Sequence, residues 1–161
     1  MPAVPARSSA DIPTRERLLS MSGYDYLIGM RDGTLSSPAI SGTLNFRIAE
    51  VERGRVIVEG TPEFPHTNAF GAPHGGWYGT LLDTCMACAV MSEVPKGSYY
   101  TTLEYRVNIT RAVPLGMTVR AIGVLQHVGR STGVSRGEIL GAEDGKVYAT
   151  GSTTCLIMSG G

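Results

Sequence analysis

The sequence predicts an α+β domain in which a long antiparallel sheet curls around one central helix. Residues 75–92 contain no proline and few polar side chains, so a helix there is apolar on all sides and has to be surrounded by protein. Almost all of the chain after this helix is typical of strands joined by short turns. Because strand residues alternate between two faces, such a sheet has an apolar inner face that can cover the helix.

The segments before the central helix predict a shorter helix, a hairpin and a loop. Thr14 can cap a helix that ends near Gly33. Two short alternating runs, 44–49 and 55–59, suit an antiparallel hairpin. The prolines of residues 61–73 predict a loop that leads into the central helix.

Four strands are predicted after the central helix. In the first of them the odd positions are mostly apolar and the even positions polar, which gives the strand one apolar face. The connections are short and turn-like, so we expect an antiparallel meander. The predicted strands are residues 101–109, 117–128, 133–140 and 146–157.

Length and charge limit the class of protein. A chain of 161 residues fits one domain, and we expect residues 1–13 to be a flexible tail and residues 14–161 the domain. Its 14 basic and 14 acidic residues give no net charge and form no basic cluster, so nucleic acid is not an expected partner. Neither a signal peptide nor a membrane span is indicated, which predicts a cytoplasmic protein without a membrane partner.

The three cysteines do not suit a disulfide framework or a zinc site, because their number is odd and a second close pair is missing. Cys85 and Cys88 have the spacing of a redox pair, and that remains the alternative to packing in the core. Buried free cysteines usually act as small apolar side chains, so the core interpretation is favoured. We expect no metal site.

Asp83 is the single acid within the apolar segment. Burying an unpaired carboxylate costs several kcal/mol, so we expect this side chain to be partnered, protonated or facing a cavity. Gly75 and Gly76 begin the helix, where free backbone N–H groups and the helix dipole favour an oxyanion. The alternative is that Asn68, His74 and the glycines only cap the helix and turn the loop.

Together these residues form a more specific pattern. Asn68, His74, Gly75, Gly76 and Asp83 stand at the spacing of an Asn/Gln–HGG–Asp/Glu motif. The pattern resembles the PaaI-type and hydroxybenzoyl-CoA thioesterases of the hotdog superfamily, and the resemblance extends from about residue 44 to residue 158. It implies a hotdog fold and the hydrolysis of an acyl-CoA to free acid and CoA.

The resemblance also implies roles for individual residues. The Gly75 N–H would polarise the thioester carbonyl, and Asn68 would assist in positioning. Asp83, from the partner subunit, would be the nucleophile or the general base that activates water. Thr102 would hold the water, with Thr101 as an alternative.

Further implied residues lie outside the reaction centre. His74 would orient its loop, and Arg111 and Ser131 would contact the CoA part of the substrate; a solvated charge is the alternative for Arg111. No separate cofactor is expected, because CoA belongs to the substrate. The resemblance further implies a homodimer with shared active sites, assembled into a homotetramer as a dimer of dimers.

One departure from the family pattern concerns the acyl group. Relatives that act on hydroxybenzoyl-CoA carry Thr one turn after the acid, where this chain has Ala87, and an Asp in place of Glu also favours the PaaI-type branch. We expect a pocket for an aryl or medium aliphatic acyl group, lined by Trp77, Tyr78, Met86 and Ala87. The alternative functions are a hotdog acyl-CoA hydratase or dehydratase and a non-catalytic acyl-CoA-binding module.

Overall fold

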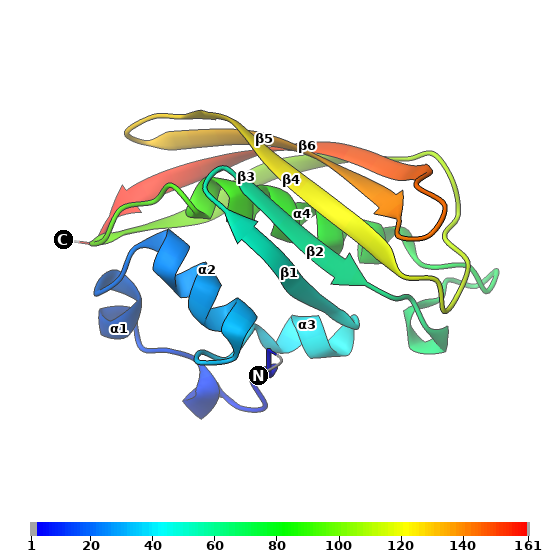
Figure 1. The fold of residues 1–161 in the computed structure, drawn as a ribbon, viewed down its shortest axis with the longest axis horizontal. Helices are drawn as coiled ribbons and strands as arrows, with labels where there is room; N and C mark the ends of the chain where they lie inside the picture. The colour runs from blue at the N-terminus through cyan, green and yellow to red at the C-terminus, as the bar shows by residue number, and fades with distance from the viewer. Residues whose placement is uncertain (1–2, 161) are drawn as a thin grey trace.

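The computed structural model describes residues 3–160, and in it a curved six-stranded antiparallel sheet covers the long helix α4 (Gly75–Met91) (Figure 1). The strand order is β1-β2-β4-β5-β6-β3. The predicted α+β arrangement of a sheet curled around an apolar helix is confirmed. The strands are β1 (Phe46–Glu52), β2 (Arg55–Gly60), β3 (Ser98–Ile109), β4 (Val119–Val128), β5 (Thr132–Gly141) and β6 (Val147–Ser159).

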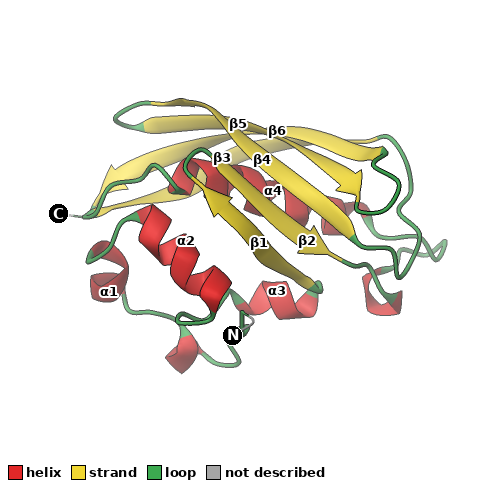
Figure 2. Cartoon of the chain, in the orientation of Figure 1, coloured by secondary structure: helices red, strands yellow, loops and turns green. Residues whose placement is uncertain are grey.

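The N-terminal helices α1 (Arg15–Leu19), α2 (Gly23–Asp32) and α3 (Ala39–Thr43) lie on the concave side of the sheet, which also holds α4 (Figure 2). One continuous helix was predicted from Thr14 to near Gly33. This prediction is wrong, because the segment forms two helices, α1 and α2. The Ser22 hydroxyl accepts the Asp25 N–H at 3.1 Å and thereby begins a second helix. Gly33 ends that helix with φ of 77°, as predicted.

Short 3-10 turns complete the element order at Ser9–Asp11 and Phe64–His66. The second of them lies in the predicted loop of residues 61–73, which is confirmed. Within the described part of the chain, none of the helices has the length and apolar character needed to cross a bilayer.

The predicted flexible tail of residues 1–13 begins outside the described residues. From residue 3 onward the segment contacts the chain before α3. The Ala6 N–H donates to the Ser37 carbonyl at 2.8 Å, and the Ser37 N–H donates to the Val4 carbonyl at 3.0 Å. Ala6 is buried. The division into a tail and a single domain stays a prediction.

The predicted meander holds for β4, β5 and β6, but β3 is an exception. It pairs with β6 at one edge of the sheet and not with β4, the next strand along the chain. The connection of residues 110–118 is longer than the two to five residues of a typical hairpin loop, so it can carry the chain across to the other side of β5 and β6.

A β-bulge at Leu103 changes which residues of β3 face the helix. Thr102 pairs with Cys155 and Glu104 with Thr154, which leaves Leu103 as an extra residue. After the bulge the odd-numbered residues of β3 face the helix, as predicted. Before the bulge the even-numbered residues face it. The single apolar face predicted for residues 101–109 is therefore wrong for its first half.

The sheet approaches α4 closely along a row of glycines. Gly123, Gly137 and Gly151 are register partners across β4, β5 and β6. A Cβ at Gly123 would lie 2.1 Å from the Cys85 carbonyl oxygen, and one at Gly137 would lie 2.7 Å from Cγ of Met86. Because these positions have no side chain, the backbone of the sheet packs directly against the middle of α4. This contact sets the distance between the helix and the sheet.

Candidate active site

Asp83 lies in the middle of α4 and is directed at β3. Its Oδ1 accepts a hydrogen bond of 3.0 Å from the Thr102 hydroxyl. Partial burial raises the pKa of the Asp83 carboxyl above its ordinary value, and the Thr102 hydrogen bond opposes that shift. Thr101, the alternative partner considered from the sequence, is exposed. The predicted association of Asp83 with a threonine of this strand is thus present, and it involves Thr102.

The start of α4 leaves one backbone donor free. Nδ1 of His74 accepts the Gly76 N–H at 2.9 Å, so His74 is the N-cap of the helix. Within the described residues the Gly75 N–H makes no hydrogen bond, and Gly75 is exposed. Of the two glycines, Gly75 is therefore the one that can donate to a ligand oxygen.

Asn68 shapes the loop that precedes the helix. Its Oδ1 accepts the N–H groups of Phe70 at 2.9 Å and Ala72 at 3.3 Å. Gly71 within this turn has φ of 77°. The amide oxygen of Asn68 is thus committed to the loop, as in the capping interpretation, and its assistance in positioning a substrate stays a prediction.

Gly75 and Asp83 are too far apart to act on one carbonyl group. Eight residues of helix separate them, which corresponds to about 12 Å along the axis. A carbonyl oxygen held by the Gly75 N–H therefore lies beyond the reach of Asp83 in the same chain. The two groups can meet on one substrate only if each comes from a different copy of the chain.

Asp83 and Thr102 open into a cavity of about 400 Å³ between α4, β3 and the N-terminal helices. Leu18 and Met21 contribute to its wall, as does Tyr26 of α2. These residues were not anticipated, because the helical pattern of residues 14–33 gives no signal that this segment returns to the central helix.

The residues expected to line the acyl pocket divide into two groups. Ala87 lines the cavity beside Asp83. Trp77, Tyr78 and Met86 do not, and for these three the prediction is wrong. They lie on the side of α4 that packs against the sheet, and each is buried in the main core. Their polar atoms are also satisfied there: the indole N–H of Trp77 donates to the Leu44 carbonyl at 2.9 Å.

Comparison with known proteins agrees with this geometry. The sequence profile of the Thioesterase superfamily matches residues 70–148. The Caenorhabditis elegans protein F42H10.6, whose name assigns it to the esterases, is 30% identical over 126 aligned positions, and the match covers 74% of each chain. The chain belongs to the thioesterase superfamily. It is accordingly a thioester hydrolase, as predicted.

Solved structures with the hotdog fold place this thioesterase near the PaaI-type proteins. The Escherichia coli PaaI protein of the phenylacetic acid degradation operon has a TM-score of 0.70 and 25% identity, covering 77% of this chain and 87% of that one. The Streptococcus mutans protein smu.793, solved with bound acetyl-CoA, has a TM-score of 0.65 and 27% identity, with coverages of 71% and 90%. A phenylacetic acid degradation-related protein of Ralstonia eutropha JMP134 has a TM-score of 0.73 and 28% identity, with coverages of 81% and 98%. The predicted hotdog fold and the PaaI-type resemblance are confirmed.

Arg111 and Ser131, the expected CoA contacts, lie at opposite ends of the thioesterase domain. Arg111 follows β3 near the start of α4, and its guanidinium is 5.9 Å from the centroid of the Tyr148 ring. Ser131 lies in the β4–β5 turn, whose neighbour Gly133 packs against Val90 near the end of α4. The full length of α4, about 25 Å, therefore separates the two residues. As with Gly75 and Asp83, a shared ligand would need one residue from each copy.

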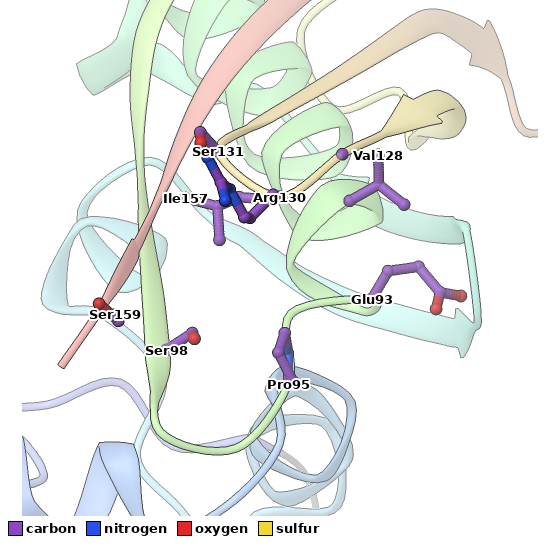
Figure 3. Close-up of a pocket in the computed structure, with 9 residues that line it drawn as sticks. Glu93, Pro95, Ser98, Val128, Arg130, Ser131, Ile157 and Ser159 are labelled. Carbon is purple, nitrogen blue, oxygen red and sulfur yellow. The ribbon is translucent and has the colours of Figure 1, made fainter. Parts of the chain in front are cut away.

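Ser131 borders a hollow of about 460 Å³ beyond the end of α4 (Figure 3). Ser98 and Ser159 are register partners on one side of it, and Glu93 lies on the other. Arg130 supplies the one basic side chain in the described lining. The hollow thus combines hydroxyl groups with one cation, Arg130, and one carboxylate, Glu93.

The cysteines behave as core residues. Cys85, Cys88 and Cys155 are free and buried. Burial, with a smaller contribution from the Asp83 charge, raises the pKa of the Cys88 thiol to about 12. Because a thiolate is the reactive form, this environment disfavours the redox interpretation and agrees with packing in the core.

Proposed function

We propose that this thioesterase hydrolyses an acyl-CoA to the free acid and CoA at a site built by two copies of the chain. The observation that carries the proposal is the position of Asp83, which is bonded to Thr102, opens into a cavity and lies about 12 Å along α4 from the free Gly75 N–H. Each copy would supply Gly75 to one site and Asp83 to the other.

In this mechanism the N–H of Gly75 donates to the thioester carbonyl oxygen and stabilises the negative charge that develops there. The ionised Asp83 of the partner subunit then acts in one of two ways. As a nucleophile it attacks the carbonyl carbon, forms a mixed anhydride and expels the CoA thiolate, and water afterwards hydrolyses the anhydride. As a general base it removes a proton from water while the water oxygen attacks the carbonyl carbon. In the general-base route the tetrahedral intermediate then collapses, its C–S bond breaks, and the proton taken up by Asp83 passes to the departing sulfur. In the nucleophilic route the expelled thiolate takes a proton from solvent.

Other groups would support these steps. The Thr102 hydroxyl would orient Asp83 and the attacking water, and His74 would hold the first turn of α4 so that the Gly75 N–H is correctly directed. Arg111 and Ser131, from different copies, would contact the CoA part of the substrate. No resident cofactor enters this mechanism, because CoA is part of the substrate.

The exposed edge of the sheet supports the pairing of two copies. Leu103, Tyr105 and Ile109 of β3 have exposed fractions of 57%, 45% and 47%. Exposed apolar side chains on an unpaired edge strand favour coverage by another chain. A second copy at this edge would bury them beside α4, where Gly75 and Asp83 lie. Assembly of two such dimers into a tetramer stays a prediction, as does a cytoplasmic location.

A panel of acyl-CoAs with a thiol reagent tests the proposed activity. We expect release of CoA, and we expect Asp83→Asn to lower kcat by orders of magnitude while substrate binding is largely retained. Glu143→Gln, an exposed acid-to-amide change on the β5–β6 turn, is the matched control and should keep full activity. Loss of the acyl-CoA without thiol release would instead indicate a hydratase or dehydratase. Binding without turnover would indicate a binding module, and near-normal turnover of Asp83→Asn would exclude the proposed mechanism.

A further inference from the structure

We propose that the cavity beside Asp83 holds an unbranched aliphatic acyl chain of medium length, and that the N-terminal helices α1 and α2 limit its length. This inference rests on the proposed thioesterase function, because it takes Asp83, which lines the cavity, to be the catalytic acid. It adds the class of acyl group and the part of the chain that selects it.

The floor of the cavity runs along the second half of α4. Asp83, Ala87 and Met91 all line it and stand on successive turns of the helix. Eight residues at a rise of about 1.5 Å each separate Asp83 from Met91, so the floor extends about 12 Å along the helix axis. A small side chain at Ala87 leaves the middle of this path open.

One wall of the cavity is formed where the start of α2 meets the end of α4. The Gly23 N–H donates to the Val94 carbonyl at 2.9 Å, and a Cβ on Gly23 would lie 2.0 Å from the Met91 carbonyl oxygen. The start of α2 is thus held backbone to backbone against the end of α4. Leu18 and Met21, which precede this contact in the chain, also line the cavity.

The chemistry of the lining favours a neutral, flexible chain. Among the described lining residues, Asp83 carries the single formal charge. Because no basic side chain accompanies it there, an acyl group that ends in a carboxylate would be repelled. Met21, Met30 and Met91 contribute thioether side chains, which adapt to irregular apolar shapes.

The size of the cavity argues against a single aromatic ring. An engineered protein cavity of about 150 Å³ suffices for benzene. The cavity here, about 400 Å³ and elongated along α4, would leave most of its length empty around a phenyl group. An extended chain of several methylene groups would fill that length and displace the water from it.

The cavity wall formed by α1 and α2 lies outside the part of the chain shared with the superfamily profile. The matched residues are 70–148, whereas α1 and α2 end at residue 32. The superfamily profile therefore includes the residues of the cavity floor on α4 but not those of α1 and α2.

A series of saturated acyl-CoAs from butyryl to palmitoyl, measured with Ala87→Leu and Leu18→Trp, tests the inference. Burial of each methylene should raise kcat/KM by about fourfold until the chain meets the wall formed by α1 and α2. Leu18→Trp should move this limit to a shorter chain, and Ala87→Leu, one turn from the acid, should move it further. Ratios to butyryl-CoA with the same variant cancel any general loss of activity. Leu18→Ala should move the limit to a longer chain.

Arg17→Trp is the matched control, since it places the same bulk on the exposed side of α1, and it should keep the wild-type length profile. An unchanged profile in Ala87→Leu and both Leu18 variants would overturn the inference while the thioesterase proposal stands. Faster turnover of phenylacetyl-CoA than of octanoyl-CoA would overturn it as well. If no acyl-CoA is hydrolysed, the proposed function fails, and calorimetric binding of the same series then decides whether affinity still rises with chain length up to a limit set by Leu18.

Discussion

The hydroxyl of Thr102 donates a hydrogen bond of 3.0 Å to Oδ1 of Asp83, and the bulge at Leu103 makes this contact possible. After the bulge the inner positions of β3 are odd, as shown by the contact of Tyr105 with the surface of Gly79. An unbroken alternation would have placed Thr102 on the outer face. One inserted residue thus lets a single strand present a hydroxyl to the acid and apolar side chains to the rest of α4.

The first prediction concerns the pH dependence of activity. Thr102→Val removes the hydrogen bond that opposes the rise in the Asp83 pKa, so the carboxyl should ionise at a higher pH. If activity needs the carboxylate, the acidic limb of the kcat/KM profile should move to higher pH, and Thr102→Ser should restore it. The exposed neighbour substitution Thr101→Val is the control. An equal shift in both valine variants would show that the contact with Asp83 is not its cause.

The second prediction is that the acid lowers stability at neutral pH. Because the pKa of Asp83 is raised by burial, the folded chain binds a proton more tightly than the unfolded chain. Between the two pKa values the folded state holds more protons, so stability falls as the pH rises through that range. Asp83→Asn, which still accepts from Thr102, should therefore have a higher free energy of unfolding at pH 7.

Urea unfolding at several pH values measures this difference. The advantage of Asp83→Asn should shrink as the pH falls and should vanish below the ordinary aspartate pKa of about 4, where the acid is protonated in both states. Glu143→Gln should show no such gain, since Glu143 is exposed. A difference that is independent of pH would mean that ionisation of Asp83 does not cause it.

The third prediction distinguishes the loss of the Gly75 N–H from the steric effect of a larger residue at position 75. Proline is well suited to the first residue of a helix, and His74 has ψ of 143°, which is compatible with a following proline. Gly75→Pro should preserve α4 while it removes the donor, and kcat should fall by about 10² to 10³. Gly75→Ala retains the N–H, and its Cβ would meet Ile109 at an ordinary 3.5 Å, so a smaller loss is expected. If kcat falls equally in Gly75→Pro and Gly75→Ala while their circular dichroism is unchanged, the Gly75 N–H does not take part in the mechanism.

The fourth prediction concerns the sharing of sites between copies. When Gly75→Pro and Asp83→Asn chains are refolded together, each mixed dimer has one site with both defects and one site with neither. Activity in the mixture should therefore rise well above the low activity of each variant alone. Tagged subunits purified as mixed dimers measure the effect directly. Verified mixed dimers without activity would place the two groups in the same copy's site.

The sequence was a good guide where a local pattern decides the structure. The apolar run beginning at Gly75 predicted α4, and Thr14 and Gly33 marked true helix ends. The motif around Asp83 identified the residues that the structure places at the cavity and at the start of the helix. These features depend on neighbours in the chain, so the pattern contains the information.

Long-range packing decided the features that the sequence did not predict. The edge position of β3 depends on pairing with β6, and the bulge at Leu103 appears only in that register. The position of Trp77 depends on its packing beside Gly60 of β2. The cavity wall at Leu18 depends on the contact between Gly23 and the end of α4. The local hydrophobic periodicity of the sequence does not indicate any of these contacts.

The last prediction tests the contact between the sheet and the helix. A methyl group at Gly123 would lie 2.1 Å from the Cys85 carbonyl oxygen, which belongs to the helix backbone and cannot rotate away. Gly123→Ala should therefore push β4 from α4 and destabilise the fold by about 1–3 kcal/mol or more. Gly129→Ala is the control, since its nearest contact would be an ordinary 3.4 Å to the His127 ring. Thermal unfolding should show a Tm lowered by several degrees for Gly123→Ala and nearly unchanged for Gly129→Ala.

Because α4 also carries Asp83, the loss of stability in Gly123→Ala should be accompanied by reduced activity below the Tm. A stable and fully active Gly123→Ala variant would show that the close approach of the sheet is not what positions the acid.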